Sequence, residues 1–173
     1  MENLSARPAI RRIAPASLVI IAFCALCSCS NYDATNKLAE IQYRTSSRWD
    51  SIHEKSKSAY YTTDGLSIHV TVIEDMLISL NEAVGTALAF PEVVGINEAQ
   101  ILSEAEDEAL GGEAQYRRIH LAGTTGSEPR EAVVYALKTQ RRAYVFIFAQ
   151  DNSISDGNLK AIDSIISSIR FSE

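Results

Sequence analysis

The sequence predicts an α+β domain in which an antiparallel β-sheet is flanked by helices, an α/β/α sandwich. Segments 131–137 and 144–149 are apolar on both alternating faces, so the strands they form need cover on both sides. The short turn 139–142 joins them as an antiparallel hairpin. Segment 156–169 carries a wide apolar stripe at helical spacing and supplies one covering helix. Within this unit we expect Phe146 and Ile166 to be fully buried.

Composition favours one globular domain with a terminal appendage. The chain has 173 residues, of which 46% are hydrophobic and 22% charged, which excludes a disordered tail, a collagen-like repeat and a polytopic membrane protein. The formal net charge is −6, and no basic cluster accompanies it. Nucleic-acid binding is therefore excluded, because phosphate neutralisation needs clustered Lys and Arg.

Residues 1–28 have the pattern of a secretory signal peptide. Three arginines, Arg7, Arg11 and Arg12, precede an apolar run over 13–26. A membrane-spanning helix is the alternative, but crossing the hydrocarbon takes about 20 apolar residues and this run is shorter.

The end of this segment resembles a bacterial lipoprotein box. Leu26 and Ser28 stand three and one positions before Cys29, whereas Cys24 and Cys27 each follow a bulky residue. We therefore expect lipidation, including palmitate, at Cys29, and two or three acyl chains anchor a protein stably where one does not. The residue after the cysteine is a serine, typical of sorting to the outer membrane, facing the periplasm. The mature chain keeps no other cysteine, so it has no disulfide and no thiol nucleophile.

Residues 29–58 are predicted to form an N-terminal spacer or helix. Their apolar positions recur at intervals of three or four, which indicates a helix over 33–57 with a narrow stripe: Leu38, Ile41, Thr45, Trp49 and Ile52.

The domain proper is expected over 59–173 and opens with a hairpin and a helix. Strands on either side of Asp64 and Gly65 form the hairpin, the second of them alternating apolar and polar residues up to Ile73. Ser79 and Glu82 form a capping box that starts a helix ending before Pro91.

The middle of the domain is predicted to hold a second hairpin. Strands over 99–110 and 113–121 flank a Gly-Gly turn, and 123–130 is expected to be a loop. The acidic run 104–108 contains Glu104, Glu106 and Glu108 on one face. It is better explained as a solvated edge strand than as a calcium site, because calcium needs six or more convergent oxygens.

The sequence offers little support for a catalytic or metal-binding site. His53, His69 and His120 lie at no mutual ligand spacing, although His69 and His120 could meet on neighbouring strands. Segment 152–163 has some spacing of an EF-hand, but a helix N-cap at Asp156 explains it better. A mixed-charge patch is possible near strand ends, with a solvated face as the plainer interpretation: Glu113, Arg117, Arg118, Arg141 and Arg142. No metal, cofactor or catalytic residue is predicted.

The order of elements resembles the PsbP-like superfamily over about 59–173. The resemblance rests on the early hairpin, the Ser-Leu-x-Glu helix start, the strand entering Gly-Gly, the hairpin 135–148 and the C-terminal Ile-rich helix. The Pro-x-x-Trp usual after the first hairpin is absent at Ile73–Met76, and the helix over 33–57 is an addition. The resemblance implies an antiparallel sheet between helices and roles in binding, assembly or envelope maintenance, and it supplies no catalytic residues.

These observations together predict a non-catalytic cell-envelope lipoprotein, held at the membrane by Cys29, that binds a protein partner or a small ligand. One alternative is an envelope hydrolase with His69 or His120 as general base. The other is a structural spacer subunit whose helix 33–57 docks onto a larger complex.

Overall fold

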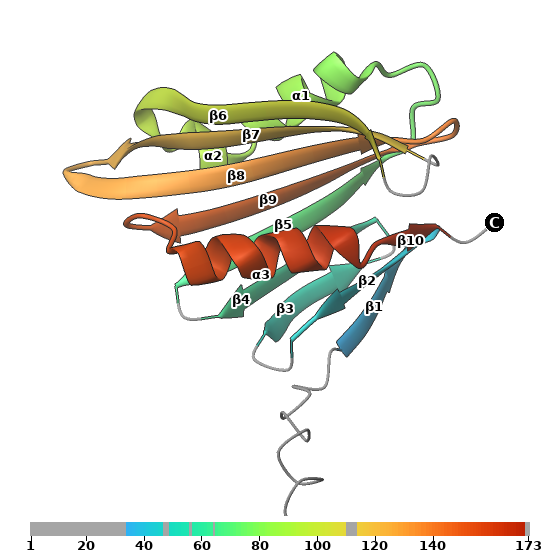
Figure 1. The fold of residues 1–173 in the computed structure, drawn as a ribbon, viewed down its shortest axis with the longest axis horizontal. Coiled ribbons are helices and arrows are strands. Elements are labelled where there is room, and N and C mark those ends of the chain that lie inside the picture. The colour runs from blue at the N-terminus through green and yellow to red at the C-terminus, as the bar shows by residue number, and fades with distance from the viewer. Residues whose placement is uncertain (1–33, 47–48, 56, 64, 110–113, 172–173) are drawn as a thin grey trace, which may run out of the picture. The chain divides into compact units, whose positions relative to one another are not determined.

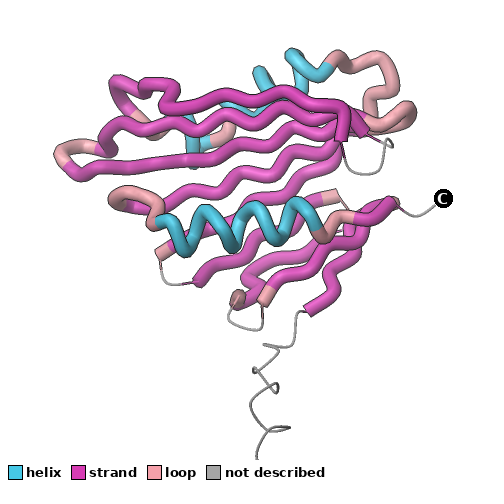
Figure 2. The backbone as a smooth tube through the Cα atoms, viewed as in Figure 1, coloured by secondary structure: helices cyan, strands magenta, loops and turns pink. Residues whose placement is uncertain are grey.

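The computed structural model describes residues 34–46, 49–55, 57–63, 65–109 and 114–171, which hold ten strands and three helices. Strands make up most of this part of the chain (Figure 2). The strands are β1 (Ala34–Leu38), β2 (Ile41–Thr45), β3 (Asp50–Lys55), β4 (Ser58–Thr63), β5 (Leu66–Ile73), β6 (Asn97–Ala109), β7 (Ala114–Thr125), β8 (Glu128–Lys138), β9 (Ala143–Asp151) and β10 (Arg170–Phe171). The helices are α1 (Leu80–Leu88), α2 (Pro91–Val94) and α3 (Asp156–Ser167).

The strands form two antiparallel sheets. The large sheet has the order β3-β4-β5-β9-β8-β7-β6, and the small sheet has the order β1-β2-β10. Helices α1 and α2 cover one face of the large sheet, whereas α3 and the small sheet cover the other (Figure 1). The predicted α+β fold with helices on both faces of an antiparallel sheet is confirmed.

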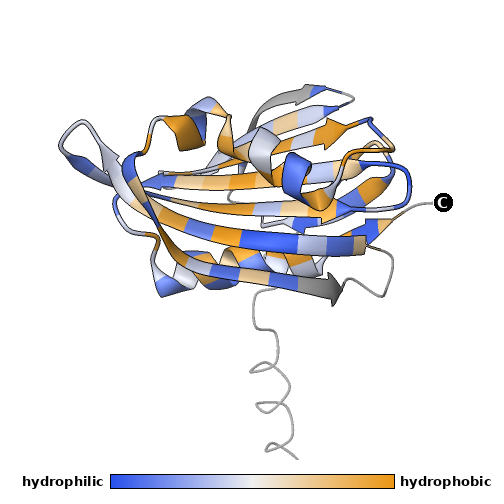
Figure 3. Ribbon diagram, turned by 90° about the horizontal axis from the view of Figure 1, so that it is seen from above, coloured by the Kyte–Doolittle hydropathy of each residue, from blue (hydrophilic) through white to orange (hydrophobic). Residues whose placement is uncertain are grey.

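The core beneath α3 is built from large side chains. Alternating residues of β5, β8 and β9 point to this face, and Phe146 and Ile162 are completely buried there. Phe146 packs edge-on against Tyr43 of the small sheet, with ring centroids 5.4 Å apart. The expected burial of Phe146 and Ile166 is confirmed, since Ile166 is 6% exposed. Hydrophobic residues run along the central strands in Figure 3, and hydrophilic residues gather in the turns.

The core beneath α1 is built from small side chains. The residues of β8 and β9 that face this helix are alanine, valine and isoleucine, and α1 contributes Ala83, Val84 and Ala87. Small side chains on both partners let the helix lie close to the sheet. The predicted capping box is present, since Ser79 accepts from the backbone N–H of Glu82 and the Glu82 carboxylate accepts from that of Ser79.

The predicted helix over 33–57 is wrong. This segment forms β1, β2 and β3, and Ile41 and Tyr43 are buried in the core beneath α3. Leu38 and Ile41 are paired across a turn in which Ala39 has φ 52°, so their spacing of three reflects a hairpin. Ile41 and Thr45 share a face because residues four apart do so in a strand as well as in a helix.

The described part of the segment 29–58 is therefore not a helical spacer but a set of strands that belong to the domain. The β3 strand belongs to the large sheet, and β2 pairs with β10 at the C-terminal end of the domain. The described domain therefore begins by Ala34 and not at residue 59. Residues 1–33, including the predicted signal peptide and Cys29, lie outside the described residues.

Two local expectations need smaller corrections. Segment 123–130 is mostly strand, because β7 and β8 extend to a tight turn at Gly126, whose φ is +65°. Helix α3 is capped by Ser155, not by Asp156. The expected end of the first helix before Pro91 is confirmed, because α1 ends at Leu88, and Pro91 begins the short helix α2 in agreement with the preference of proline for the first helical turn.

Candidate functional site: a charged end beside an exposed apolar turn

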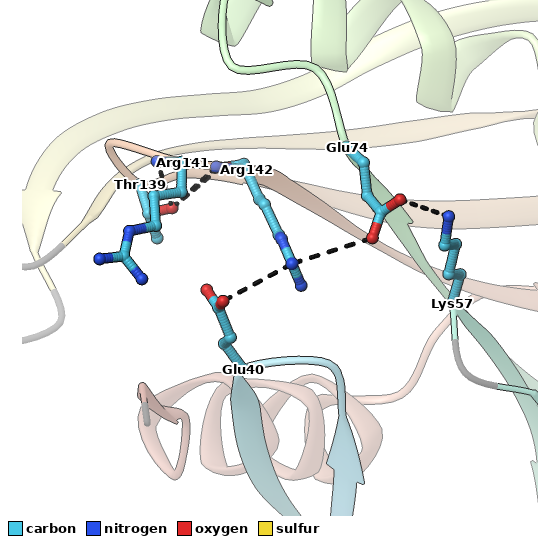
Figure 4. Close-up of polar contacts among 6 residues, drawn as sticks. All are labelled: Glu40, Lys57, Glu74, Thr139, Arg141 and Arg142. Atoms are coloured by element: carbon cyan, nitrogen blue, oxygen red, sulfur yellow. Dashed lines mark hydrogen bonds and ion pairs between the residues drawn. The ribbon is translucent and has the colours of Figure 1, made fainter. Parts of the chain in front are cut away.

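Four charged residues from separate turns meet at one end of the domain, here called the charged end: Glu40, Lys57, Glu74 and Arg142 (Figure 4). Arg142 Nη2 lies 3.6 Å from Glu40 Oε1 and 3.9 Å from Glu74 Oε1, and Glu74 also pairs with Lys57. Glu40 comes from the β1–β2 turn of the small sheet, whereas Glu74 follows β5 of the large sheet. Arg142 thus connects the two sheets.

The backbone of the β8–β9 hairpin fixes the position of Arg142. The Thr139 hydroxyl oxygen accepts from the backbone N–H groups of Arg141 and Arg142 at 3.3 and 3.1 Å, and the Thr139 N–H donates to the Arg142 carbonyl at 2.9 Å. In Figure 4 the Arg141 side chain points away from Glu40. Only the second arginine of the pair therefore enters the charged end.

Ionisation at the charged end reflects these contacts. The hydrogen bond from Lys57 lowers the pKa of Glu74, desolvation opposes this effect, and the positive charges of Lys57 and Arg142 lower the pKa further. Burial raises the pKa of Tyr144, and the negative charge of Glu40 adds to that effect. Glu74 is therefore held ionised.

The loop between β5 and α1 exposes two large apolar side chains beside the charged end. Met76 and Leu77 are 67% and 92% exposed, and they follow Glu74 of the charged end by two and three residues. Their turn is ordered, because Asp75 Oδ1 accepts from the Leu77 N–H at 2.8 Å, and the capping box at Ser79 fixes the next residues. The fold thus presents an apolar pair at a defined place next to a rim of charges.

This combination matches the anatomy of protein–protein interfaces. Their centres are rich in large apolar side chains such as Met, and charged residues surround that centre. Sequence reasoning missed Met76 and Leu77, although the run of three apolar residues between Asp75 and the capping Ser79 was a visible signal. It placed Arg142 among five candidate patch residues, but no local pattern indicated Glu40 or Glu74 as its partners.

The remaining members of the predicted mixed-charge patch do not assemble with Arg142. Arg117 reaches the α1 side of the sheet, where it contacts Asn81 and Glu104. Arg118 reaches the α3 side, where its guanidinium lies 5.9 Å from the centre of the Tyr135 ring. Glu113 lies outside the described residues. The expectation of a single patch is therefore wrong for Arg117 and Arg118.

The two histidines considered for catalysis lie on opposite faces of the large sheet. His69 on β5 contacts Glu92 and Phe90 on the α1–α2 side, with Nδ1 3.3 Å from Glu92 Oε1. His120 on β7 is three strands away, and its Nε2 lies 3.0 Å from Glu131 Oε2. The expectation that the two histidines could meet on neighbouring strands is wrong.

The surroundings of His120 differ from a nucleophile–base–acid arrangement. Glu131 is the central group, because it contacts His120 and also accepts from the Ile154 N–H at 2.9 Å and from Ser153. Burial works against ionisation, but the hydrogen bonds from Ile154, Ser153 and His120 together lower the pKa of Glu131. In a hydrolytic triad the imidazole, not the carboxylate, stands in the middle.

The described residues contain no group of three or more His, Cys, Asp or Glu side chains placed to hold a metal ion. Among the helices of the described part of the chain, none combines the length and apolar character needed to span a bilayer.

Comparison with solved structures identifies the fold. The Ran-binding protein Mog1p of Saccharomyces cerevisiae matches with a TM-score of 0.61 and 11% identity, over 83% of this chain and 97% of that chain. Cyanobacterial PsbP (CyanoP) of Synechocystis matches with a TM-score of 0.59 and 12% identity, over 85% and 99% of the two chains. LpqN of Mycobacterium tuberculosis, involved in cell envelope biogenesis, matches with a TM-score of 0.50 and 14% identity, over 83% and 93%.

No protein-family model matches the sequence, and no curated protein matches it either. The matches to solved structures show that the chain has the PsbP/Mog1 fold, as its resemblance to the PsbP-like superfamily implied.

Proposed function

We propose that this chain is a non-catalytic cell-envelope lipoprotein, anchored through Cys29 to the outer membrane on its periplasmic side, that binds a protein partner. The observation that carries the binding role is the Met76–Leu77 turn beside the charged end. Leu77 is 92% exposed in the isolated domain. Burial of this side chain by a partner would contribute about 2 kcal/mol to the free energy of binding.

The position of the turn suits a protein anchored by its N-terminus. Strand β1 starts at Ala34, five residues after Cys29, and runs towards the β1–β2 turn that carries Glu40. Glu40, and with it the charged end, thus lies at the opposite end of β1 from Ala34, through which the chain connects to Cys29.

The fold supports a binding role without specifying a partner. Mog1p is described as a Ran-binding protein and LpqN as involved in cell envelope biogenesis. The described residues of this chain offer an exposed apolar pair with a charged rim, which is suited to a protein ligand. A hydrolase using His69 or His120 gains nothing from their positions on opposite faces.

Metabolic labelling with an alkyne fatty acid tests the anchor. We expect labelling and membrane retention of the wild-type chain and of Cys27→Ser, and loss of both in Cys29→Ser. Cys27→Ser is the matched control, because it removes a cysteine two residues away. Labelling of Cys29→Ser at the wild-type level would contradict the anchor.

Paired leucine variants test the docking turn. Leu77→Ser should lose partners that co-purify with the wild-type protein from solubilised membranes. Leu102→Ser should keep them, because Leu102 is also exposed, at 53%, but lies on the edge strand β6. Equal loss in both variants, with unchanged unfolding curves, would contradict docking at the Met76–Leu77 turn.

A further inference from the structure

His69 and Glu92 join the short helix α2 to the large sheet. His69 Nδ1 lies 3.3 Å from Glu92 Oε1, and the two side chains are 23% and 21% exposed. The His69 ring also meets Phe90 edge-on, with ring centroids 4.7 Å apart. Phe90 directly precedes α2 and Glu92 lies within it, whereas His69 belongs to β5. Both contacts therefore hold the same short segment against β5.

One carboxylate oxygen of Glu92 is buried without a hydrogen bond. Oε1 faces His69, whereas Oε2 is buried and receives no hydrogen bond from the described residues. Within the same ranges, His69 is the one basic side chain at ion-pair distance from Glu92. Burying an ionised carboxylate with too few hydrogen bonds costs free energy, and a positive charge at its side offsets that cost. This part of the fold is therefore most stable when His69 is protonated.

The other neighbours of His69 do not change charge near neutral pH. Tyr60, its register partner on β4, meets the ring edge-on with centroids 6.1 Å apart. On the opposite side, β9 presents apolar side chains: Val145, Ile147 and Ala149. A carboxyl group and a phenol keep their charge between pH 5.5 and 7.5, whereas an imidazole changes its own. A change of pH in this range therefore acts on the contact of His69 with Glu92.

The segment held by this contact closes part of the core beneath α1. Val93 and Ile96 are each 5% exposed and belong to that core. The helix itself is a single turn, in which the N–H groups of Val93 and Val94 donate to the Phe90 carbonyl at 2.9 and 2.8 Å. A helix this short has little stability of its own, so its position depends on side-chain contacts. The contacts of His69 are among those that fix it.

From these observations we propose that His69 and Glu92 form a pH-dependent clasp on α2. When His69 is protonated, it donates a charge-assisted hydrogen bond to the Glu92 carboxylate and holds α2 against β5. As the pH rises and His69 loses its proton, this attraction weakens, and α2 opens more often and exposes Phe90 and Val93. The clasp uses no residue of the charged end and does not depend on acylation of Cys29.

Hydrogen exchange of the α2 amides in the full chain tests the clasp. The N–H groups of Val93, Val94, Gly95 and Ile96 are hydrogen-bonded within this segment, so their exchange reports its opening. After correction for the intrinsic effect of pH on exchange, we expect about fivefold greater protection at pH 5.5 than at pH 7.5, because a charge-assisted hydrogen bond replaces a neutral one. At both pH values these amides should exchange faster than that of Ile147 in the centre of the sheet, which identifies a local opening.

Two variants assign the effect to the pair. His69→Gln keeps a hydrogen-bond donor but does not titrate, and Glu92→Gln keeps an acceptor but carries no charge. In both variants the α2 amides should be equally protected at the two pH values. His53→Gln is the matched control, because it removes a histidine on β3, which lies two strands from β5. This control should keep the wild-type difference.

Each other outcome overturns the proposal. Equal protection of the wild-type amides at the two pH values means that protonation does not act on α2. Greater protection at pH 7.5 means that the positive charge of His69 does not hold the helix. A difference that persists in His69→Gln, or that disappears in His53→Gln, belongs to another group. The wild-type comparison needs no substitution, so the clasp remains testable if a variant fails to fold.

Discussion

The hydroxyl oxygens of Tyr43 and Tyr61 lie 3.0 Å apart in the core, Tyr43 on β2 of the small sheet and Tyr61 on β4 of the large one. Their rings meet edge-on, with centroids 6.3 Å apart. The small sheet is therefore part of the core that the large sheet and α3 share. The N-terminal strands are needed for the fold itself.

Removal of the N-terminal strands should unfold the domain. A chain from residue 32 to 173 is expected to unfold cooperatively in denaturant, because it keeps the compact unit Tyr32–Glu173. A chain from 59 to 173 loses Ile41 and Tyr43 and leaves Tyr61 exposed, so it should show no cooperative transition. Circular dichroism during urea titration measures both. A cooperative transition in the shorter chain would show that the small sheet is dispensable.

Truncation of Phe146 should destabilise the domain strongly. Phe146 is fully buried and packs against Tyr43 and Phe148, so Phe146→Ala should cost about 3–5 kcal/mol in the free energy of unfolding. Ile166→Ala should cost about 2–5 kcal/mol. Glu106→Ala on the exposed edge strand β6 should change the free energy of unfolding by less than about 0.5 kcal/mol. A larger loss from Glu106→Ala than from Phe146→Ala would contradict the assignment of faces.

Two glycine-to-alanine changes should have opposite signs. A Cβ at Gly123 would clash with the Asn97 carbonyl oxygen and lie 2.6 Å from Ile96 Cγ2, so Gly123→Ala should cost about 1–3 kcal/mol. A Cβ at Gly85 in α1 meets nothing within 4 Å, so Gly85→Ala should stabilise by about 0.5–1 kcal/mol. Thermal unfolding of the two variants measures the difference. A Gly123→Ala variant as stable as the wild type would contradict the close approach of β7 to Asn97.

The hydrogen bonds that Glu131 accepts from Ile154, Ser153 and His120 should make stability depend on pH in the acid range. The folded state lowers the pKa of Glu131 below its ordinary value of 4.5, so the unfolded state binds more protons near that pH. The resulting stabilisation is present above pH 4.5 and is lost as the pH falls through the folded-state pKa.

Glu131→Gln should therefore cost about 1–3 kcal/mol at pH 7, and its difference from the wild type should shrink as the pH falls below 4.5. Glu128→Gln, at the exposed start of β8, should follow the wild type throughout. Urea unfolding at several pH values between 3 and 7 measures both variants. A constant difference for Glu131→Gln would show that its ionisation does not contribute.

The sequence was most informative where one residue pattern admits one structure. The residues of β8 and β9 are apolar on both faces, and the helix α3 has a wide apolar stripe, so both predictions were confirmed. The capping box at Ser79 and Glu82 was readable because its four residues are consecutive in the chain.

The sequence was misleading where the same spacing fits two structures. Between 34 and 55, intervals of four residues are shared by helices and strands, and the positive φ of Ala39 has no glycine to mark it. The charged end could not be derived because its members are distant in sequence. Glu40 and Arg142 come together only through the packing of the small sheet against the large one.

The pairing of β10 with β2 has a consequence for the order of folding during synthesis. Strand β10, at the C-terminal end of the domain, completes the small sheet that β1 and β2 begin. The contact of Arg44 with Ser168 spans 124 positions. Contacts of such long range form late, because the loop they close must first be available. A nascent chain therefore has no complete core until Ser168 and β10 have been synthesised, so the two sheets and α3 are expected to fold together as one unit.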